Sequence, residues 1–144
     1  MTFRSRKNEL SYKKLRKLRL NDDNVCPFCA LKNGDGQVVH EYPQFFVAKN
    51  NFPYDLWEGL PVDDHLMIIP KRHISSLHQL TSQERKAYMD IVARYDSEGY
   101  SVYTRTESNV SKSVTHLHTH LLKLGNKHAT FTLYLSKPYI LWHN

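Results

Sequence analysis

The sequence is poor in three features, and each scarcity narrows the class of protein. It contains only two cysteines, Cys26 and Cys29, so a framework of several disulfides is excluded. It contains no run of about 18 apolar residues, which a membrane-spanning helix would need. No apolar stretch follows the charged N-terminus, so a secretory signal is not expected. We therefore expect a cytoplasmic protein whose 144 residues form one domain with a substantial core.

Acidic residues are scarce in the first twenty positions. There, Glu9 is the one acid among eight basic residues: Arg4, Arg6, Lys7, Lys13, Lys14, Arg16, Lys17 and Arg19. Residues 1–20 therefore have a net charge of +7. Residues 21–144 have a net charge of −1, which gives the total of +6. Such an arm could contact nucleic acid. The alternative is a solvated helix, because three leucines recur at roughly helical spacing. In both cases we expect the arm to lie apart from the functional residues.

Turn residues and apolar spacing divide the chain into this arm, residues 1–20, and a domain, residues 21–144. A capping box of Thr81 and Glu84 predicts a helix that continues to about Arg94. Strands are expected at 38–49 (one or two), 65–69, 100–104, 115–122, 131–135 and 139–142, and a loop at 55–64. This order predicts an α+β fold with an antiparallel sheet, one main helix and a basic N-terminal arm. A homodimer is an alternative to a monomer.

Three histidines alternate along the predicted strand at 115–122. His116, His118 and His120 are each separated by one residue, so an extended backbone places their rings on one face, about 7 Å apart. Leu117 and Leu121 then face inward. Imidazole is a nucleophile, a proton carrier near neutral pH and the commonest metal ligand. The row therefore predicts a catalytic or metal site, and the alternative is a set of surface histidines on a sheet edge.

The two cysteines form a CxxC pair, Cys26-Pro-Phe-Cys29. Such a pair is half of a tetrahedral zinc site and needs two further ligands. Two alternatives are a redox pair and two buried thiols without a function. A redox pair would be expected between a strand and a helix of a βαβ unit, and the surrounding residues do not have that pattern.

The histidine row resembles the signature of the histidine triad superfamily, His-φ-His-φ-His-φ-φ, where φ is apolar. Residues 116–122 match it apart from the polar Thr119, and residues 113–114 resemble the usual approach to it. Residues 65–73, His-Leu-Met-Ile-Ile-Pro-Lys-Arg-His, resemble the internal strand and turn of the same superfamily. Residues 50–54 resemble its Asn-x-aromatic-Pro-aromatic segment. The chain is thus similar to the zinc-binding, CxxC-containing type.

This resemblance implies a set of roles. His118 would be the nucleophile that attacks the α-phosphorus of a nucleotide conjugate, giving a covalent nucleotidyl-histidine, and His120 would donate to the leaving group or to phosphate oxygens. Asn50 would contact the ribose, and Lys112 and Ser113 would contact phosphate. A structural zinc ion would be held by four ligands: Cys26, Cys29, His65 and His116. The expected function is that of a nucleotide hydrolase or transferase. The alternatives are a non-catalytic nucleotide-binding regulatory module and a zinc-stabilised protein that contacts nucleic acid through residues 1–20.

Overall fold

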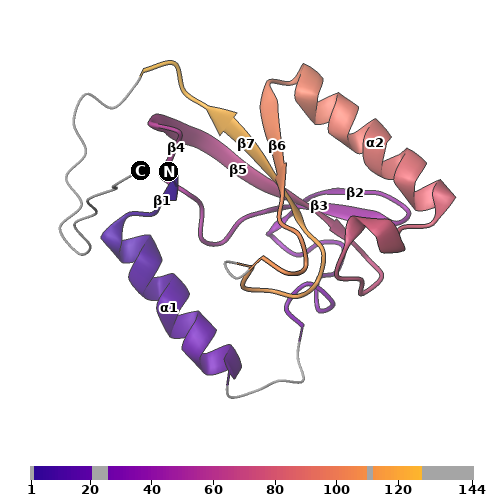
Figure 1. Ribbon diagram of the computed structural model, residues 1–144, viewed down its shortest axis with the longest axis horizontal. Helices are drawn as coiled ribbons and strands as arrows, with labels where there is room; N and C mark the ends of the chain where they lie inside the picture. Colours follow the sequence, from indigo (N-terminus) through magenta and orange to yellow (C-terminus); the bar gives the residue numbers. More distant parts are fainter. Residues whose placement is uncertain (1, 21–25, 110–111, 128–144) are drawn as a thin grey trace, which may run out of the picture.

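The computed structural model describes residues 2–20, 26–109 and 112–127. Their elements confirm an α+β fold built on an antiparallel sheet (Figure 1). The helices are α1 (Arg6–Leu20), a short 3-10 helix η1 (Leu77–Gln79) and α2 (Ser82–Ser97). The strands are β1 (Thr2–Phe3), β2 (Val38–Glu41), β3 (Phe45–Lys49), β4 (Leu56–Trp57), β5 (Leu60–Pro70), β6 (Tyr100–Thr104) and β7 (Thr119–Leu124). The two late strands predicted at 131–135 and 139–142 lie outside the described residues.

Strand β5 is the centre of the sheet. It pairs with β4 through its first residues, with β3 through Leu66 to Pro70, and with β7 along its middle. Its last six residues are all buried, as expected for an apolar run covered on both faces. β2 extends the sheet beyond β3, and β6 extends it beyond β7. All of these pairs are antiparallel.

The prediction of a loop at 55–64 is wrong, because this segment contains β4 and the beginning of β5. A two-residue turn joins the two strands: Glu58 has φ 53° and Gly59 has φ 82°. Two successive left-handed residues are typical of a type I′ hairpin, whose twist matches that of the flanking strands. The polar residues that suggested a loop are therefore those of a tight turn and of the partly exposed start of β5.

The strand predicted at 115–122 is shifted relative to β7. The strand at 100–104 is confirmed as β6, and it pairs with β7, with Tyr103 opposite His120. However, β7 begins at Thr119, so His120 is the one triad histidine that lies within it. His116 and His118 belong to the segment that leads into the strand. Leu117 and Leu121 enter the core as predicted.

Helix α2 covers the sheet next to β6 (Figure 1). Its capping box is confirmed: the Thr81 hydroxyl accepts from the Glu84 N–H, and Glu84 accepts from the Thr81 N–H at 2.8 Å. Ile91 and Tyr95 of this helix are buried in the same cluster as Phe45 of β3. Apolar residues of α2 therefore attach the helix to the core of the sheet.

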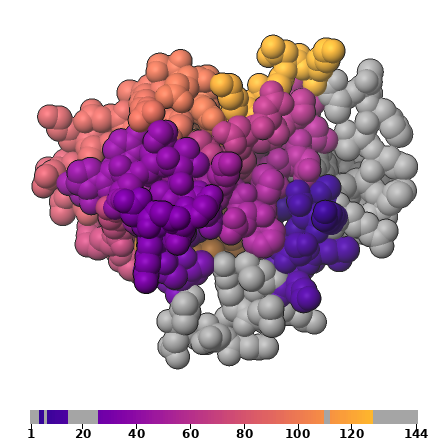
Figure 2. Space-filling model, turned by 180° about the vertical axis from the view of Figure 1, so that it is seen from behind, coloured from indigo at the N-terminus to yellow at the C-terminus, as the bar shows by residue number. Residues whose placement is uncertain are grey.

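The N-terminal residues pack against the rest of the described chain. Arg4 Nε donates to the Phe52 carbonyl at 3.0 Å, and the Ser5 N–H donates to the Asp55 carboxylate. The rings of Tyr12 and Phe52 meet edge to face, 5.8 Å between centroids. Figure 2 shows the indigo N-terminal residues directly beside the magenta residues of the central segment. The arm is thus anchored on the segment just before β4.

No helix among residues 2–20, 26–109 and 112–127 is long and apolar enough to cross a membrane.

Loss of the α2 cap should weaken the domain measurably. Thr81→Ala removes the acceptor of the Glu84 N–H, so we expect the free energy of unfolding to fall by about 1 kcal/mol. Urea unfolding followed by circular dichroism measures this change. Gln83→Ala, at an exposed position in the same turn, is the matched control. Equal stability of the two variants would contradict the role of the cap.

Candidate functional site

Four buried histidines form the centre of the candidate site. Side chains of His65, His116, His118 and His120 are between 0 and 5% exposed. The ring centroids of His118 and His120 are 5.1 Å apart, as are those of His120 and His65. Burial disfavours the charged form of imidazole, so the pKa of each of these four rings lies below its ordinary value. The row is therefore uncharged at neutral pH.

The His118 ring is held in one tautomer. Its Nδ1 lies 2.9 Å from the backbone carbonyl of His116, which can only accept, so Nδ1 carries the proton. Nε2 then keeps its lone pair. The Phe28 ring, 5.2 Å from the His118 ring between centroids, covers it from the side of the cysteine pair. The neighbouring Lys112 and Arg105 add to burial in lowering the pKa of His118. His118 is thus an uncharged ring of fixed orientation whose Nε2 is unprotonated.

His120 is oriented through His65. The Tyr54 N–H donates to His65 Nδ1 at 3.1 Å, so a neutral His65 carries its proton on Nε2. His65 Nε2 lies 2.9 Å from His120 Nδ1, which must then accept. The remaining proton of His120 is on Nε2. His120 therefore presents an N–H donor away from His65.

Two arginines lie beside these rings. Arg105 Nη2 donates to the Tyr54 hydroxyl at 2.8 Å, and Arg105 Nη1 lies 3.3 Å from His120 Nε2. Arg4 places its guanidinium 4.6 Å from the centroid of the Tyr54 ring. After burial, these two charges are the main causes that lower the pKa of His65 to about 3. The positive charge at this end of the row therefore belongs to arginines and not to histidines.

A second cluster, at the other end of the row, could hold a metal ion. It consists of Cys26, Cys29, His73 and His116, whose ligand atoms all lie within 4.8 Å of one another. Sγ of Cys29 is 3.1 Å from Nδ1 of His73 and 3.5 Å from Nδ1 of His116. Zinc bonded to sulfur at about 2.3 Å and to nitrogen at about 2.0 Å would place neighbouring ligand atoms about 3.5 Å apart. The spacing of this donor set fits such an ion.

The tautomer of His116 suits the same role. Its Nε2 lies 2.8 Å from the Pro70 carbonyl and must donate to it, which leaves the Nδ1 lone pair facing the cysteines. Metal-ligating histidines usually donate their second nitrogen to a carbonyl or carboxylate in this way. Pro70 ends β5, so the central strand itself fixes the direction of the ring.

The structure places His73, and not His65, with the cysteines, so the predicted fourth ligand needs correction. Both nitrogens of His65 are engaged elsewhere, with Tyr54 and with His120. His65 and His73 are the first and last residues of the same predicted block, on opposite ends of a buried run. Because the run is extended, the two histidines reach opposite ends of the site.

The three predicted substrate-binding residues lie around the row in different ways. Asn50 Nδ2 is 3.1 Å from His65 Nε2, while Asn50 Oδ1 accepts from the Phe52 N–H. Lys112 is half-buried and donates to the Ser75 carbonyl. Ser113 is exposed. Their roles towards a substrate stay predictions.

Three residues of the site were missed from the sequence. His73 was quoted in the motif but given no function, although the second histidine of that motif was the available signal. Arg105 follows β6 directly, and none of the motifs includes it. Arg4 was counted as one charge of the arm. Nothing in the local sequence pairs it with Tyr54, because that contact spans fifty residues.

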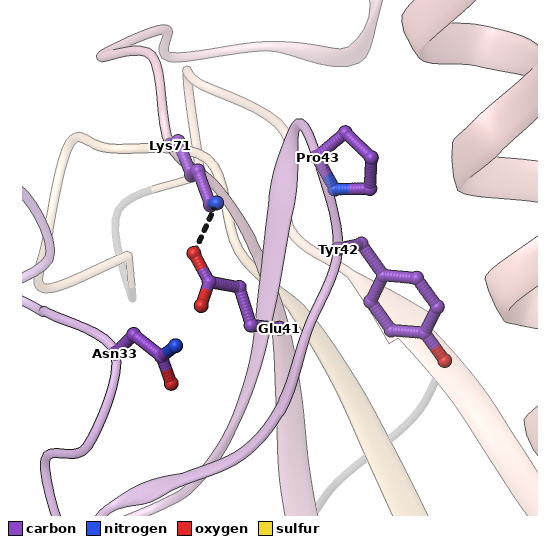
Figure 3. A pocket seen from close by; sticks show the side chains of 5 residues that line it. All are labelled: Asn33, Glu41, Tyr42, Pro43 and Lys71. Atoms are coloured by element: carbon purple, nitrogen blue, oxygen red, sulfur yellow. Dashed lines mark hydrogen bonds and ion pairs between the residues drawn. The ribbon is translucent and has the colours of Figure 1, made fainter.

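A separate surface pocket is lined by Asn33, Glu41, Tyr42, Pro43 and Lys71 (Figure 3). The Lys71 ammonium forms an ion pair with the Glu41 carboxylate, so its charge is already paired. None of the buried histidines lines this pocket. We therefore assign no part of the chemistry to it.

An antiparallel sheet with a row of buried histidines along β7 and the segment that leads into it defines a protein of the histidine-triad type. The sequence pattern of the HIT domain matches residues 32–127, and the chain belongs to the HIT family. The resemblance inferred from residues 116–122 is thereby confirmed.

Relatives of this family are similar in sequence and in fold. The chain is 37% identical over 95 residues to an uncharacterised HIT-like protein of Chlamydia muridarum, which covers 60% of this chain and 70% of that protein. A solved HIT family hydrolase from Legionella pneumophila Philadelphia 1 is 25% identical with a TM-score of 0.52, covering 74% and 97% of the two chains. A zinc-bound histidine triad family protein from Mycobacterium smegmatis has the same fold, with a TM-score of 0.52 at 22% identity over 70% and 76%.

The buried histidines should make the domain sensitive to acid. His65 is neutral in the folded protein down to about pH 3, whereas in the unfolded chain it takes up a proton below about pH 6.5. Between these values the unfolded state binds more protons, so stability falls as pH falls, by up to about 1.4 kcal/mol per pH unit. His65→Asn should give a shallower decline of the free energy of unfolding between pH 6.5 and 4.

Urea unfolding at a series of pH values measures this slope. The exposed His78, replaced by Asn, is the control and should keep the slope of the parent. A parent and a His65→Asn variant with the same slope would show that His65 does not carry this proton linkage.

Proposed function

We propose that this chain is a nucleotide hydrolase or nucleotidyltransferase that acts at the α-phosphate of a nucleotide conjugate. The observation that carries the proposal is the hydrogen bond between His118 Nδ1 and the His116 carbonyl. It leaves Nε2 unprotonated and fixes the direction in which it can attack. A buried histidine that served packing alone would not need an unprotonated Nε2 beside the positive charges of Lys112 and Arg105.

The reaction would begin when the His118 Nε2 lone pair forms a bond to the α-phosphorus. The bond from phosphorus to the leaving-group oxygen or nitrogen breaks, and its electron pair stays with the leaving group. The imidazole becomes a cation in the nucleotidyl-histidine, and its Nδ1–H continues to donate to the His116 carbonyl. This bond stabilises the positive charge that develops during the attack.

Water or another acceptor would then attack the phosphorus and release the nucleotide. The N–P bond breaks, its electrons return to Nε2, and the acceptor loses a proton. His120, with its Nε2–H directed away from His65, would donate to phosphate oxygens or to the leaving group. Lys112 and Ser113 would add positive charge and a hydroxyl at the phosphate, and Asn50 would contact the ribose. These donors act in the manner of an oxyanion hole.

We further propose that the cluster of Cys26, Cys29, His73 and His116 holds a structural zinc ion. The donor set, two thiols and two imidazoles, is one that zinc prefers, and four protein ligands leave no open position for a substrate. Such an ion would tie residues 26–29 to the triad segment and keep Phe28 against His118. Contact between residues 1–20 and nucleic acid, and a homodimer, stay predictions.

Loss of His118 should stop turnover without loss of the fold. His118→Ala removes the attacking nitrogen and none of the four proposed metal ligands, so kcat should fall at least about 10³-fold while the variant stays folded and keeps its metal and most of its stability. Release of a nucleoside monophosphate from a panel of nucleotide conjugates measures the activity. His78→Ala, at an exposed histidine, is the control.

Two outcomes would change the proposal. A His118→Ala variant that turns over as fast as its parent would exclude the covalent mechanism. A parent that binds nucleoside monophosphates but cleaves none of the panel would favour the regulatory-module alternative.

Metal content should depend on His73 and not on His65. We expect about one zinc per purified parent chain, loss of that zinc in His73→Asn and in Cys26→Ser, and its retention in His65→Asn. Elemental analysis by mass spectrometry measures the ratio. Because metal binding and folding are coupled, a chelator should lower the melting temperature of the parent but not of His73→Asn. Zinc that persists in His73→Asn and disappears in His65→Asn would restore the ligand set predicted from the sequence.

A further inference from the structure

The end of the histidine row that lies farthest from the metal cluster carries more hydrogen-bond donors than the protein can satisfy. His120 Nε2 bears a proton, as argued above, yet the Arg105 Nη1 donor lies only 3.3 Å from it. Two donors at this distance cannot bond to each other. Arg105 Nε is also buried without a hydrogen-bond partner in the described part of the chain. Such a group normally has a partner, a water or a ligand.

Arg105 also has no carboxylate to balance its charge. Among the residues that the structure describes, its polar neighbours are the Tyr54 hydroxyl and His120, and its guanidinium lies 5.4 Å from the centroid of the Tyr103 ring. By contrast, Arg72 and Arg94 each contact a glutamate. Arg105 is therefore a half-buried cation whose surroundings are aromatic rings and further donors.

Arg4 brings a second charge to the same place from the N-terminal arm. Its side chain is only 16% exposed, although it is a surface residue by sequence. Its guanidinium lies 4.6 Å from the Tyr54 ring centroid, and its acidic neighbour Glu9 is at 3.8 Å. Both arginines lower the pKa of His120, so their field reaches the triad. Two guanidinium groups thus converge on the ring of Tyr54, next to the histidine that faces the leaving group.

We propose that Arg105 and Arg4, together with the Nε2–H of His120, form a subsite for the second phosphate of the substrate. The bond cleaved is then a phosphoanhydride, and the leaving group is a phosphate-bearing group and not an amine. This inference rests on the proposed function, since it names the leaving group of that same reaction. Arginine is suited to the task because its planar fork of donors matches phosphate oxygens.

The chemistry balances without a further reactant. His118 Nε2 forms the bond to the α-phosphorus, and the bond from that phosphorus to the bridging oxygen breaks. The electron pair stays on this oxygen, so the second phosphate leaves with one more negative charge, which the two arginines stabilise. A phosphate leaves as an anion and needs no proton, whereas an amine must be protonated. Water then releases the nucleoside monophosphate and gives up one proton to the solvent.

Equilibrium binding to the full chain tests the subsite directly, because the β-phosphate of a nucleoside diphosphate would occupy it. Titration calorimetry should show that the parent binds the α,β-methylene analogues of ADP and GDP, in which the anhydride cannot be cleaved, about 10- to 100-fold more tightly than AMP and GMP, the range expected for charge-assisted hydrogen bonds. Arg105→Gln and Arg4→Gln should each reduce this preference to about 3-fold or less. Arg105→Lys, which keeps the charge, should retain part of it.

Each control removes one exposed positive charge. Lys7→Gln, three residues after Arg4, is the control for Arg4, and Lys86→Gln, on the helix α2 that packs beside β6, is the control for Arg105. Both should keep the full preference for diphosphates. Melting temperatures of all variants report whether they are folded, and Arg4→Gln provides a second reading if Arg105→Gln does not fold.

The outcomes separate this inference from the function on which it rests. A parent without a diphosphate preference, or arginine variants that lose monophosphate and diphosphate affinity equally, would overturn the subsite, while cleavage through His118 could still stand. A preference that disappears in the arginine variants supports the subsite, even if the parent cleaves no dinucleoside polyphosphate and the proposed turnover fails. Failure of the parent to bind any of the four nucleotides would overturn both.

Discussion

The two halves of the site depend on His116. Its ring donates to the Pro70 carbonyl at the end of β5 and turns Nδ1 towards the two cysteines, while its backbone carbonyl accepts from His118. One completely buried residue therefore fixes both the cysteine and histidine cluster and the tautomer of His118. The two rings have different hydrogen-bond partners. The His116 ring contacts Pro70 and the cysteines. The His118 ring uses Nδ1 for the His116 carbonyl, and its Nε2 has no hydrogen-bond partner among the described residues.

Much of the fold could be predicted from local patterns. The capping box at Thr81 marked the start of α2, the apolar run to Pro70 marked the buried part of β5, and the strand at 100–104 has the same bounds as β6. These features depend on neighbouring residues, so the sequence carries them directly. The turn at Glu58 and Gly59 was not predicted, because its left-handed conformation is favoured only where it joins two paired strands. The surrounding polar residues were therefore interpreted as a loop.

The site was predictable where a motif names its residues and unpredictable where the contact is long-range. The triad and the cysteine pair were found, but the choice between His65 and His73 required the direction of β5. The extended part of β5 from His65 to Pro70 separates their positions by more than a ligand shell can span. Arg4 and Arg105 could not be assigned at all, since their meeting at Tyr54 is produced by the docking of the arm.

Phe28 has a consequence for the electrostatics of the whole row. It lies between the two cysteines in sequence and packs on the rings of both His116 and His118. An apolar wall of this kind lowers the local dielectric, so a charge beside His118 acts more strongly than the same charge on the surface. It also keeps dissolved ions at a distance. The fields of Lys112 and Arg105 at His118 should therefore survive at ionic strengths that screen exposed pairs such as Arg94 and Glu98.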